Sequence, residues 1–217
     1  MRPEAILVVV CVGALGVLLA AEYRRLRWLK VVAKVSASAA FVTLGALRWA
    51  PGDTCGAWIV LGLVLSAGGD LALVLPKGLP AGMGLFLGAH LAYLAAWHAL
   101  LPVGGWSWGV LAPLVLVAAL VVRWLWPRLG RLRWAVAAYV TVITLMVWGA
   151  LSVWRAGVGP SGGWIAAGAV LFWLSDLAVA RNRFVREAFV NRAVGLPVYY
   201  AAQLVLALVV GTGGTLR

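Results

Sequence analysis

Residues 171–184 read LFWLSDLAVARNRF, an apolar run that is interrupted by one aspartate and closed by two arginines. The apolar segment around it, residues 163–181, has about the length that a helix needs to cross a bilayer. A charge inside a membrane helix costs at least ~2.5 kcal/mol on insertion scales, and such residues usually face a bundle interior or an aqueous cavity. The stretch therefore predicts a membrane-spanning helix with Asp176 turned toward the inside of a bundle.

The rest of the chain is also strongly apolar and poor in charged residues. Its 217 residues are 65% hydrophobic and 11% charged, whereas a soluble domain carries about twice that charged fraction. Apolar segments of bilayer length alternate with short basic or Gly/Pro-rich connectors. The predicted spans are approximately 5–21, 30–50, 56–75, 83–101, 107–126, 134–154, 163–181 and 196–210. We expect an all-α integral membrane protein whose eight transmembrane helices form one bundle, a single polytopic domain over residues 1–217.

The basic residues predict how this bundle is oriented. A net charge of +12 could indicate nucleic-acid binding, but Lys and Arg gather in short connectors, where they set topology and meet anionic headgroups. Thirteen of them flank the connectors after the first, third, fifth and seventh spans, and four lie on the other side. The positive-inside rule then predicts a multi-pass protein of the cell (inner) membrane with both termini outside. The first span is expected to stay uncleaved, because its stronger basic cluster follows it. No nucleic-acid partner is expected.

Polar side chains from five predicted helices fall in the cytoplasmic half of this membrane topology. They are Lys34, Asp70, His90 with Tyr93, Asp176, and Tyr199 and Tyr200 with Gln203. Positions three or four apart share a helix face, so each group can point in one direction. One interpretation is structural, with Asp70–Lys34 or Asp176–Arg183 as ion pairs that fix the packing. The convergence of the whole set on one layer favours a functional cavity.

A short repeat and four longer motifs add to this interpretation. Asp-Leu-Ala occurs at residues 70–72 and 176–178, in helices that run in the same direction, which allows an arrangement as two four-helix halves. The longer motifs are GGDLALVLP (68–76), FLGAHLAY (86–93), GAVLFWLSDLAVARNRF (168–184) and PVYYAAQLVLAL (197–208).

In these four motifs the chain resembles the YhhN/TMEM86 family of lysoplasmalogenases, from about residue 30 to residue 210. The resemblance implies hydrolysis of the vinyl ether bond of a lysoplasmalogen, either lysoplasmenylethanolamine or lysoplasmenylcholine. The products would be a fatty aldehyde and glycerophosphoethanolamine or glycerophosphocholine. The site residues that it implies are Lys34, Asp70, His90, Tyr93, Asp176, Arg183, Tyr200 and Gln203. One departure is Val35, which follows Lys34 at a position where many relatives are expected to have proline.

The chemistry of a vinyl ether suits a pair of carboxyl groups. Protonation at carbon gives an oxocarbenium ion, water adds to it, and the hemiacetal collapses to aldehyde and alcohol. Two carboxyls can divide the work when their surroundings keep one protonated and the other ionised. We expect Asp70, flanked by small apolar residues, to be the general acid, and Asp176 to be the ionised group that stabilises the cation and positions water. The reverse assignment remains open.

The other polar residues are expected to support this reaction. His90 and Tyr93 would orient a carboxyl or relay the proton. Tyr200 and Gln203 would hold the water or the glycerol oxygens of the substrate.

Two basic residues near the interface are expected to bind the phosphate of a single-chain ether phospholipid, whose tail would enter between helices. They are Lys34 and Arg183, of which the arginine can make a bidentate contact. No cofactor is expected, although Asp70, His90 and Asp176 together would also be a metal-ligand set.

Two other classes of function use similar residues. Intramembrane Asp, His and Lys also serve as proton relays in transporters. Against a small-molecule or proton-coupled transporter, the polar layer lies toward one membrane face, whereas carrier sites usually lie near the midplane. A lipid-binding protein without turnover is the third class.

Overall fold

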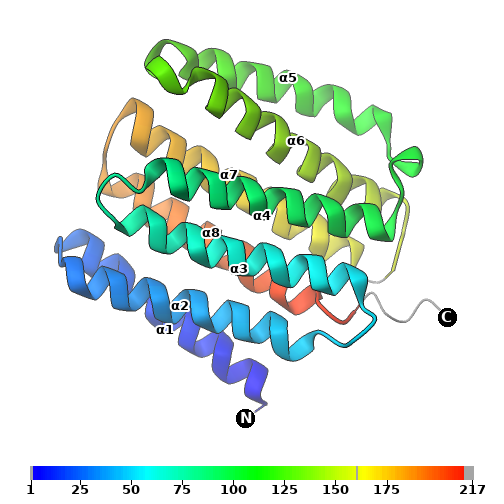
Figure 1. Cartoon of the computed structure of the whole chain (residues 1–217), viewed down its shortest axis with the longest axis horizontal. Helices are drawn as coiled ribbons and strands as arrows, with labels where there is room; N and C mark the ends of the chain where they lie inside the picture. The colour runs from blue at the N-terminus through cyan, green and yellow to red at the C-terminus, as the bar shows by residue number, and fades with distance from the viewer. Residues whose placement is uncertain (1, 160, 213–217) are drawn as a thin grey trace.

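The computed structural model describes residues 2–159 and 161–212, and its main elements are eight long antiparallel helices (Figure 1). They are α1 (Pro3–Tyr23), α2 (Arg27–Arg48), α3 (Thr54–Val74), α4 (Leu79–Leu100), α5 (Trp108–Leu125), α6 (Arg133–Arg155), α7 (Gly162–Ala180) and α8 (Phe189–Val209). All eight are long and apolar enough to cross a membrane. The predicted all-α fold with eight spans is confirmed, and the chain is a multi-pass membrane protein.

Local chemistry explains where several helices begin. The Asp53 side chain caps α3 by accepting a hydrogen bond from the Gly56 amide at 2.8 Å. Proline occupies the first turn of α1 and of α4, where a missing amide hydrogen is not needed. The clearest difference from the sequence-based boundaries is α8, which begins at Phe189 instead of near residue 196. It continues through Pro197, because membrane helices tolerate proline where neighbouring groups satisfy the freed carbonyl.

The helices are arranged in layers between two peripheral pairs (Figure 1). The hairpin α1–α2 lies at one side of the bundle and α5–α6 at the other, with α3, α4, α7 and α8 between them. Helix α8 also packs against α1, α2 and α3, whereas α5 packs chiefly against α6. Because α8 joins helices of the N-terminal half, any division into two four-helix halves does not give two separate bodies.

Glycine brings the central helices close together. An added Cβ at Gly69 of α3 would lie 2.7 Å from the Phe86 ring of α4, and one at Gly168 of α7 would lie 2.7 Å from Leu206 of α8. Small residues permit this approach of helix backbones in membranes. In α3 the close contact lies immediately before Asp70, so this carboxyl is carried by a tightly packed part of the helix.

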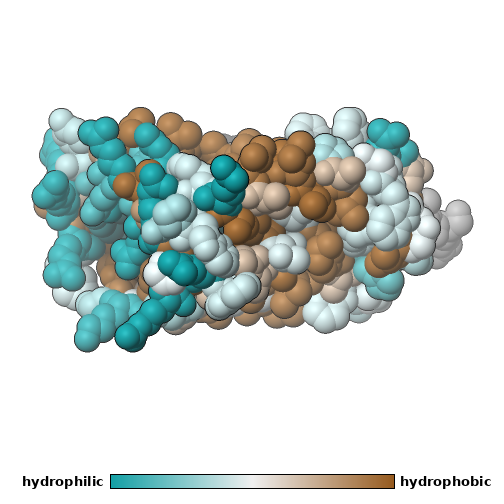
Figure 2. All heavy atoms as spheres, turned by 90° about the horizontal axis from the view of Figure 1, so that it is seen from above, coloured by the Kyte–Doolittle hydropathy of each residue, from teal (hydrophilic) through white to brown (hydrophobic). Residues whose placement is uncertain are grey.

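One end of the bundle is strongly hydrophilic. Figure 2 shows an apolar belt across the middle of the molecule and a dense group of polar side chains at one end. The connectors α1–α2, α3–α4, α5–α6 and α7–α8 all lie at one end of the helices (Figure 1), and most of the Lys and Arg residues belong to them. We call it the charged end. Its placement in the cytoplasm stays a prediction from the positive-inside rule.

Candidate active site

A cavity of about 860 Å³ lies inside the bundle at the charged end. Residues of α1 to α8 and of two connectors line it. The mouth is formed by charged and amide side chains of helix ends and connectors. The floor, which lies within the spans, contains Lys34, Asp70, Phe86, Tyr139, Asp176 and Tyr199. Both intramembrane aspartates that the sequence singles out therefore face one cavity.

Asp70 is buried and fully bonded. Its Oδ1 accepts a hydrogen bond from Lys34 Nζ at 2.8 Å, and its Oδ2 accepts one from Ser38 Oγ at 2.8 Å. Tyr200 Oη lies 3.5 Å from Oδ2. The side chains of Asp70 and Lys34 are 3% and 10% exposed. Two donors, one of them the Lys34 ammonium, therefore contact the Asp70 carboxyl, and the ion pair that the sequence offered as a packing role is present.

Asp176 has different partners. Tyr139 Oη donates to Oδ2 at 2.7 Å, and His90 Nε2 lies 3.1 Å from the same oxygen. His90 Nε2 is also 3.0 Å from Tyr139 Oη, so three groups from α4, α6 and α7 meet at one point. Among the residues that the structure describes, Oδ1 of Asp176 makes no hydrogen bond. The side chain is 19% exposed, and its free oxygen is available to a ligand in the cavity.

The bonding of His90 also assigns its tautomer. The side chain is fully buried, and its Nδ1 has no hydrogen-bond partner in the described part of the chain. A proton on Nε2 can be donated to the carboxylate, whereas a proton on Nδ1 would be buried without an acceptor. A proton on Nε2 therefore fits this geometry, in which the ring orients the Asp176 carboxyl.

Tyr139 is the main residue that the sequence analysis did not include. It contacts both His90 and Asp176 and lines the cavity. Its distinguishing sign in the sequence is that it is the single tyrosine of the apolar segment from residue 134 to residue 154. Its role depends on the rotation of α6, which places Tyr139 opposite α4 and α7 at the same depth.

Three predicted site residues lie outside the cavity lining, namely Tyr93, Gln203 and Tyr200, the last of which lies beside Asp70. Tyr93 Oη donates to Gln203 Oε1 at 2.9 Å, and both side chains are fully buried outside the cavity lining. Tyr93 lies about one turn deeper than His90 on α4, where its ring stacks on Trp97 with 6.2 Å between centroids. The roles expected of Tyr93 beside a carboxyl and of Gln203 beside the substrate stay predictions, and the contact that the structure gives these two side chains is with each other.

The two predicted phosphate ligands, Lys34 and Arg183, lie at different depths of the cavity. Lys34 is held by Asp70 on the cavity floor, so it is not free at the interface as expected. Arg183 is exposed at the cavity mouth, and among the described ion pairs it does not join Asp176, which lies against His90 instead. Of the two expected cations, only Arg183 is placed to meet a headgroup at the membrane surface.

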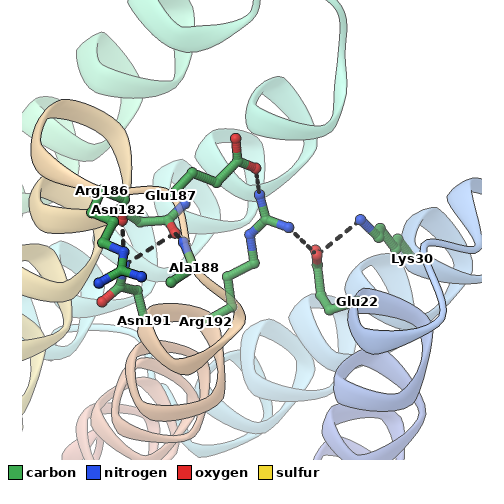
Figure 3. Close-up of polar contacts among 8 residues, drawn as sticks. All are labelled: Glu22, Lys30, Asn182, Arg186, Glu187, Ala188, Asn191 and Arg192. Atoms are coloured by element: carbon green, nitrogen blue, oxygen red, sulfur yellow. Dashed lines mark hydrogen bonds and ion pairs between the residues drawn. The ribbon is translucent and has the colours of Figure 1, made fainter.

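The turn that carries Arg183 is braced by two asparagines. After α7 the backbone makes a π-helical turn, Arg181–Val185. The Asn182 side chain accepts a hydrogen bond from the Ala188 amide at 3.1 Å, and Asn191 Nδ2 donates to the Arg186 carbonyl at 2.7 Å (Figure 3). These bonds join the turn to the start of α8 and hold it at the mouth.

An ionic network joins three helices on another side of the mouth. Glu22 of α1 contacts Lys30 of α2 at 2.8 Å and Arg192 of α8 at 2.9 Å (Figure 3). Arg192 also contacts Glu187 at 2.6 Å. Partly exposed pairs of this kind stabilise a fold only slightly, but the network neutralises Lys30 and Arg192.

The alternative metal-ligand set is not assembled in the described residues. Within residues 2–159 and 161–212, no three His, Cys, Asp or Glu side chains come together as a metal site. Asp70 is paired with Lys34, whereas His90 and Asp176 meet Tyr139.

Comparisons with known proteins identify the family of the chain. Residues 29–210 match the model of the YhhN family. The lysoplasmalogenase TMEM86B of Sus scrofa is 36% identical over 71% of this chain and 64% of its own length. A lysoplasmalogenase of Mycobacterium tuberculosis is 36% identical over 69% of this chain and 58% of its own length. The chain thus spans roughly three fifths of these relatives. No solved structure gives a significant match. Because the family model covers most of the sequence, the chain belongs to the YhhN family.

Proposed function

We propose that this protein is a membrane-embedded lysoplasmalogenase, an ether hydrolase that converts lysoplasmenylethanolamine or lysoplasmenylcholine to a fatty aldehyde and the glycerophospho-base. The observation that carries the proposal is a pair of carboxyl groups with different partners, Asp70 and Asp176, at one intramembrane cavity. Relatives that bear the name lysoplasmalogenase support the substrate class.

The hydrogen bonds favour Asp176 as the general acid and Asp70 as the ionised group, the reverse of the roles expected from the sequence. Asp70 has both oxygens occupied by donors, one of them an ammonium, so it suits the role of a fixed anion beside a developing cation. Asp176 uses only Oδ2 for its bonds to Tyr139 and His90. Its Oδ1 can carry a proton into the cavity, so we assign Asp176 as the general acid.

The reaction then proceeds with all atoms accounted for. The proton of Asp176 moves to the alkene carbon that is not bonded to oxygen, and the oxygen-bearing carbon becomes an oxocarbenium ion. The Asp70 carboxylate stabilises this charge, while Tyr139 and His90 donate to the newly formed Asp176 carboxylate. Water attacks the oxocarbenium carbon and returns a proton to Asp176. The hemiacetal finally breaks its bond to the glycerol oxygen, which takes up the hemiacetal proton as aldehyde forms.

Aldehyde release by the purified protein in detergent tests this proposal. With lysoplasmenylethanolamine as substrate, Asp176→Asn should lower the rate at least ~100-fold, the lower range for general acid catalysis. Asp70→Asn should abolish most of the activity through loss of the anion. Arg128→Gln, an exposed substitution at the charged end outside the cavity, is the control. Full activity of either aspartate variant would remove that residue from the scheme. Thermal stabilisation of the wild type by substrate without any product would favour a binding or transport protein.

A further inference from the structure

Three cations at the cavity mouth have no acidic partner among the described residues. They are Arg27 at the start of α2, Lys77 in the connector α3–α4, and Arg183 in the turn after α7. The other basic side chains of the mouth, Lys30 and Arg192, are already paired with Glu22. The three partner-free cations are all exposed, and they come from three separate elements around one opening.

Each of these cations lies seven residues from a charged residue of the cavity floor. The pairs are Arg27 with Lys34, Asp70 with Lys77, and Asp176 with Arg183. Seven residues are close to two α-helical turns, so Arg27 and Lys34 of α2 share a face and lie about 10 Å apart along the axis. Asp176 and Arg183 are separated by the end of α7 and the start of the π-helical turn, at a similar axial offset of roughly 10 Å, and both line the cavity. Lys77 lies three residues beyond the end of α3, in the turn to α4, where its backbone is left-handed (φ 61°). The cavity therefore has two charged layers, a floor and a mouth.

The start of α2 adds to the positive potential of the mouth. Its N-cap residue, Leu26, makes no side-chain capping bond, so the first amide hydrogens of the helix remain free of a side-chain acceptor. Helix N-termini carry a partial positive charge and are suited to bind phosphate. Arg27 and Trp28, the first residues of α2, both line the cavity.

We infer that Arg27, Lys77 and Arg183 form a phosphate subsite that sets the distance between the lipid phosphate and the bond to be cleaved. This inference rests on the proposed function. In a 1-alkenyl-glycero-3-phospholipid, seven covalent bonds separate phosphorus from the carbon that takes up the proton. An extended chain of that length spans roughly 8 Å, estimated from the rise of an extended backbone. The span is comparable with the axial offset between Arg183 and Asp176, so a phosphate at the mouth places the vinyl ether at the floor.

The floor and the mouth of the cavity thus have different proposed functions. The floor charges, paired or hydrogen-bonded, act on the ether, whereas the mouth cations hold an anion in contact with water. Arginine can bind two phosphate oxygens at once, and lysine acts as a point charge. Loss of one mouth cation should therefore weaken binding of a phospholipid without changing the chemistry at the floor.

A comparison of two substrates tests the subsite. We would measure kcat/KM for 1-alkenyl-glycerophosphoethanolamine and for phosphate-free 1-alkenylglycerol in neutral mixed micelles. Lys77→Met and Arg183→Met should each lower kcat/KM roughly 10-fold for the phospholipid, mainly through KM, as expected for a lost charge-assisted hydrogen bond. The same variants should act on the phosphate-free substrate within about twofold of the wild type, and Lys77→Arg should restore the phospholipid reaction.

Matched controls separate the subsite from general surface charge. Arg128→Gln and Arg131→Gln remove exposed cations from the same end of the molecule, outside the cavity lining, and should leave both substrates unaffected. Free glycerophosphoethanolamine should inhibit the wild type competitively and inhibit Arg183→Met more weakly, which shows whether the headgroup is recognised without the alkenyl chain. Equal losses on both substrates, or no loss on either, would overturn the inference.

Binding of a non-hydrolysable ligand tests the phosphate subsite without relying on the proposed hydrolysis. If the wild type releases no aldehyde from either substrate, the proposed hydrolysis fails. The subsite still predicts that a 1-alkyl lysophospholipid raises the melting temperature of the wild type more than that of Lys77→Met. An equal shift in both proteins would refute the phosphate subsite independently of catalysis.

Discussion

The buried pair Lys34–Asp70 allows a quantitative prediction. Lys34→Met keeps most of the side-chain length but removes the ammonium that lies 2.8 Å from Asp70 Oδ1. Removal of one partner of a buried ion pair costs about 3–5 kcal/mol, because the other charge is left without compensation. Ser38 and Tyr200 remain beside the carboxylate, so we expect the lower part of this range. At about 2–4 °C per kcal/mol for a chain of this size, the melting temperature should fall by roughly 6–12 °C.

A second substitution shows whether the loss comes from the unpaired charge. In Lys34→Met combined with Asp70→Asn, neither charge remains, and the asparagine retains an oxygen for Ser38. The double variant should recover to within about 1 kcal/mol of the wild type, so the losses of the two single variants should be strongly non-additive. It should still release no aldehyde, because the anion that stabilises the oxocarbenium ion is absent.

Tryptophan fluorescence during heating in detergent measures the stability, and aldehyde release measures the function. The reasoning is refuted if Lys34→Met melts within about 2 °C of the wild type, or if the double variant melts no higher than the single one. Either result would mean that Lys34 and Asp70 do not form a stabilising ion pair. The assignment of Asp70 as the general acid would then be the better one.

Three further predictions concern single side chains and topology. Tyr139→Phe should lower kcat by roughly 10-fold with little change in KM, because one donor to the Asp176 carboxylate is lost. An unchanged kcat would show that Tyr139 takes no part in the reaction. Tyr93→Phe should destabilise the protein by about 1–3 kcal/mol in thermal unfolding while sparing kcat, because the amide of Gln203 is left buried without its partner. The opposite result, slow turnover at normal stability, would show that Tyr93 acts in catalysis. A cysteine replacing Gly104 should react with an impermeant maleimide on right-side-out spheroplasts, whereas one replacing Arg131 should react only after lysis; the reverse pattern would invert the topology.

The sequence by itself determined the class of fold and the position of the charged residues along each span. Hydropathy and charge are properties of a segment, and a bilayer requires each apolar segment to satisfy its backbone as a helix. For this reason Asp70 and Asp176 could be assigned to helices and to a common depth before any tertiary contact was known. The start of α8 could not be located, since Pro197 marks a helix boundary in water but not in a tightly packed membrane helix.

Only the tertiary structure decided which polar groups meet. Partners depend on how each helix is rotated and how closely it approaches its neighbours, and neither property can be read from one segment. Rotation of α6 brings Tyr139 to Asp176, and the depth of Tyr93 on α4 directs it to Gln203 and away from both carboxyls. The pairing of Lys34 with Asp70, which removes this lysine from the membrane surface, also requires α2 and α3 to pack face to face. Segment chemistry thus places the charges at one depth, and helix packing determines which of them are paired and which remain free for a ligand.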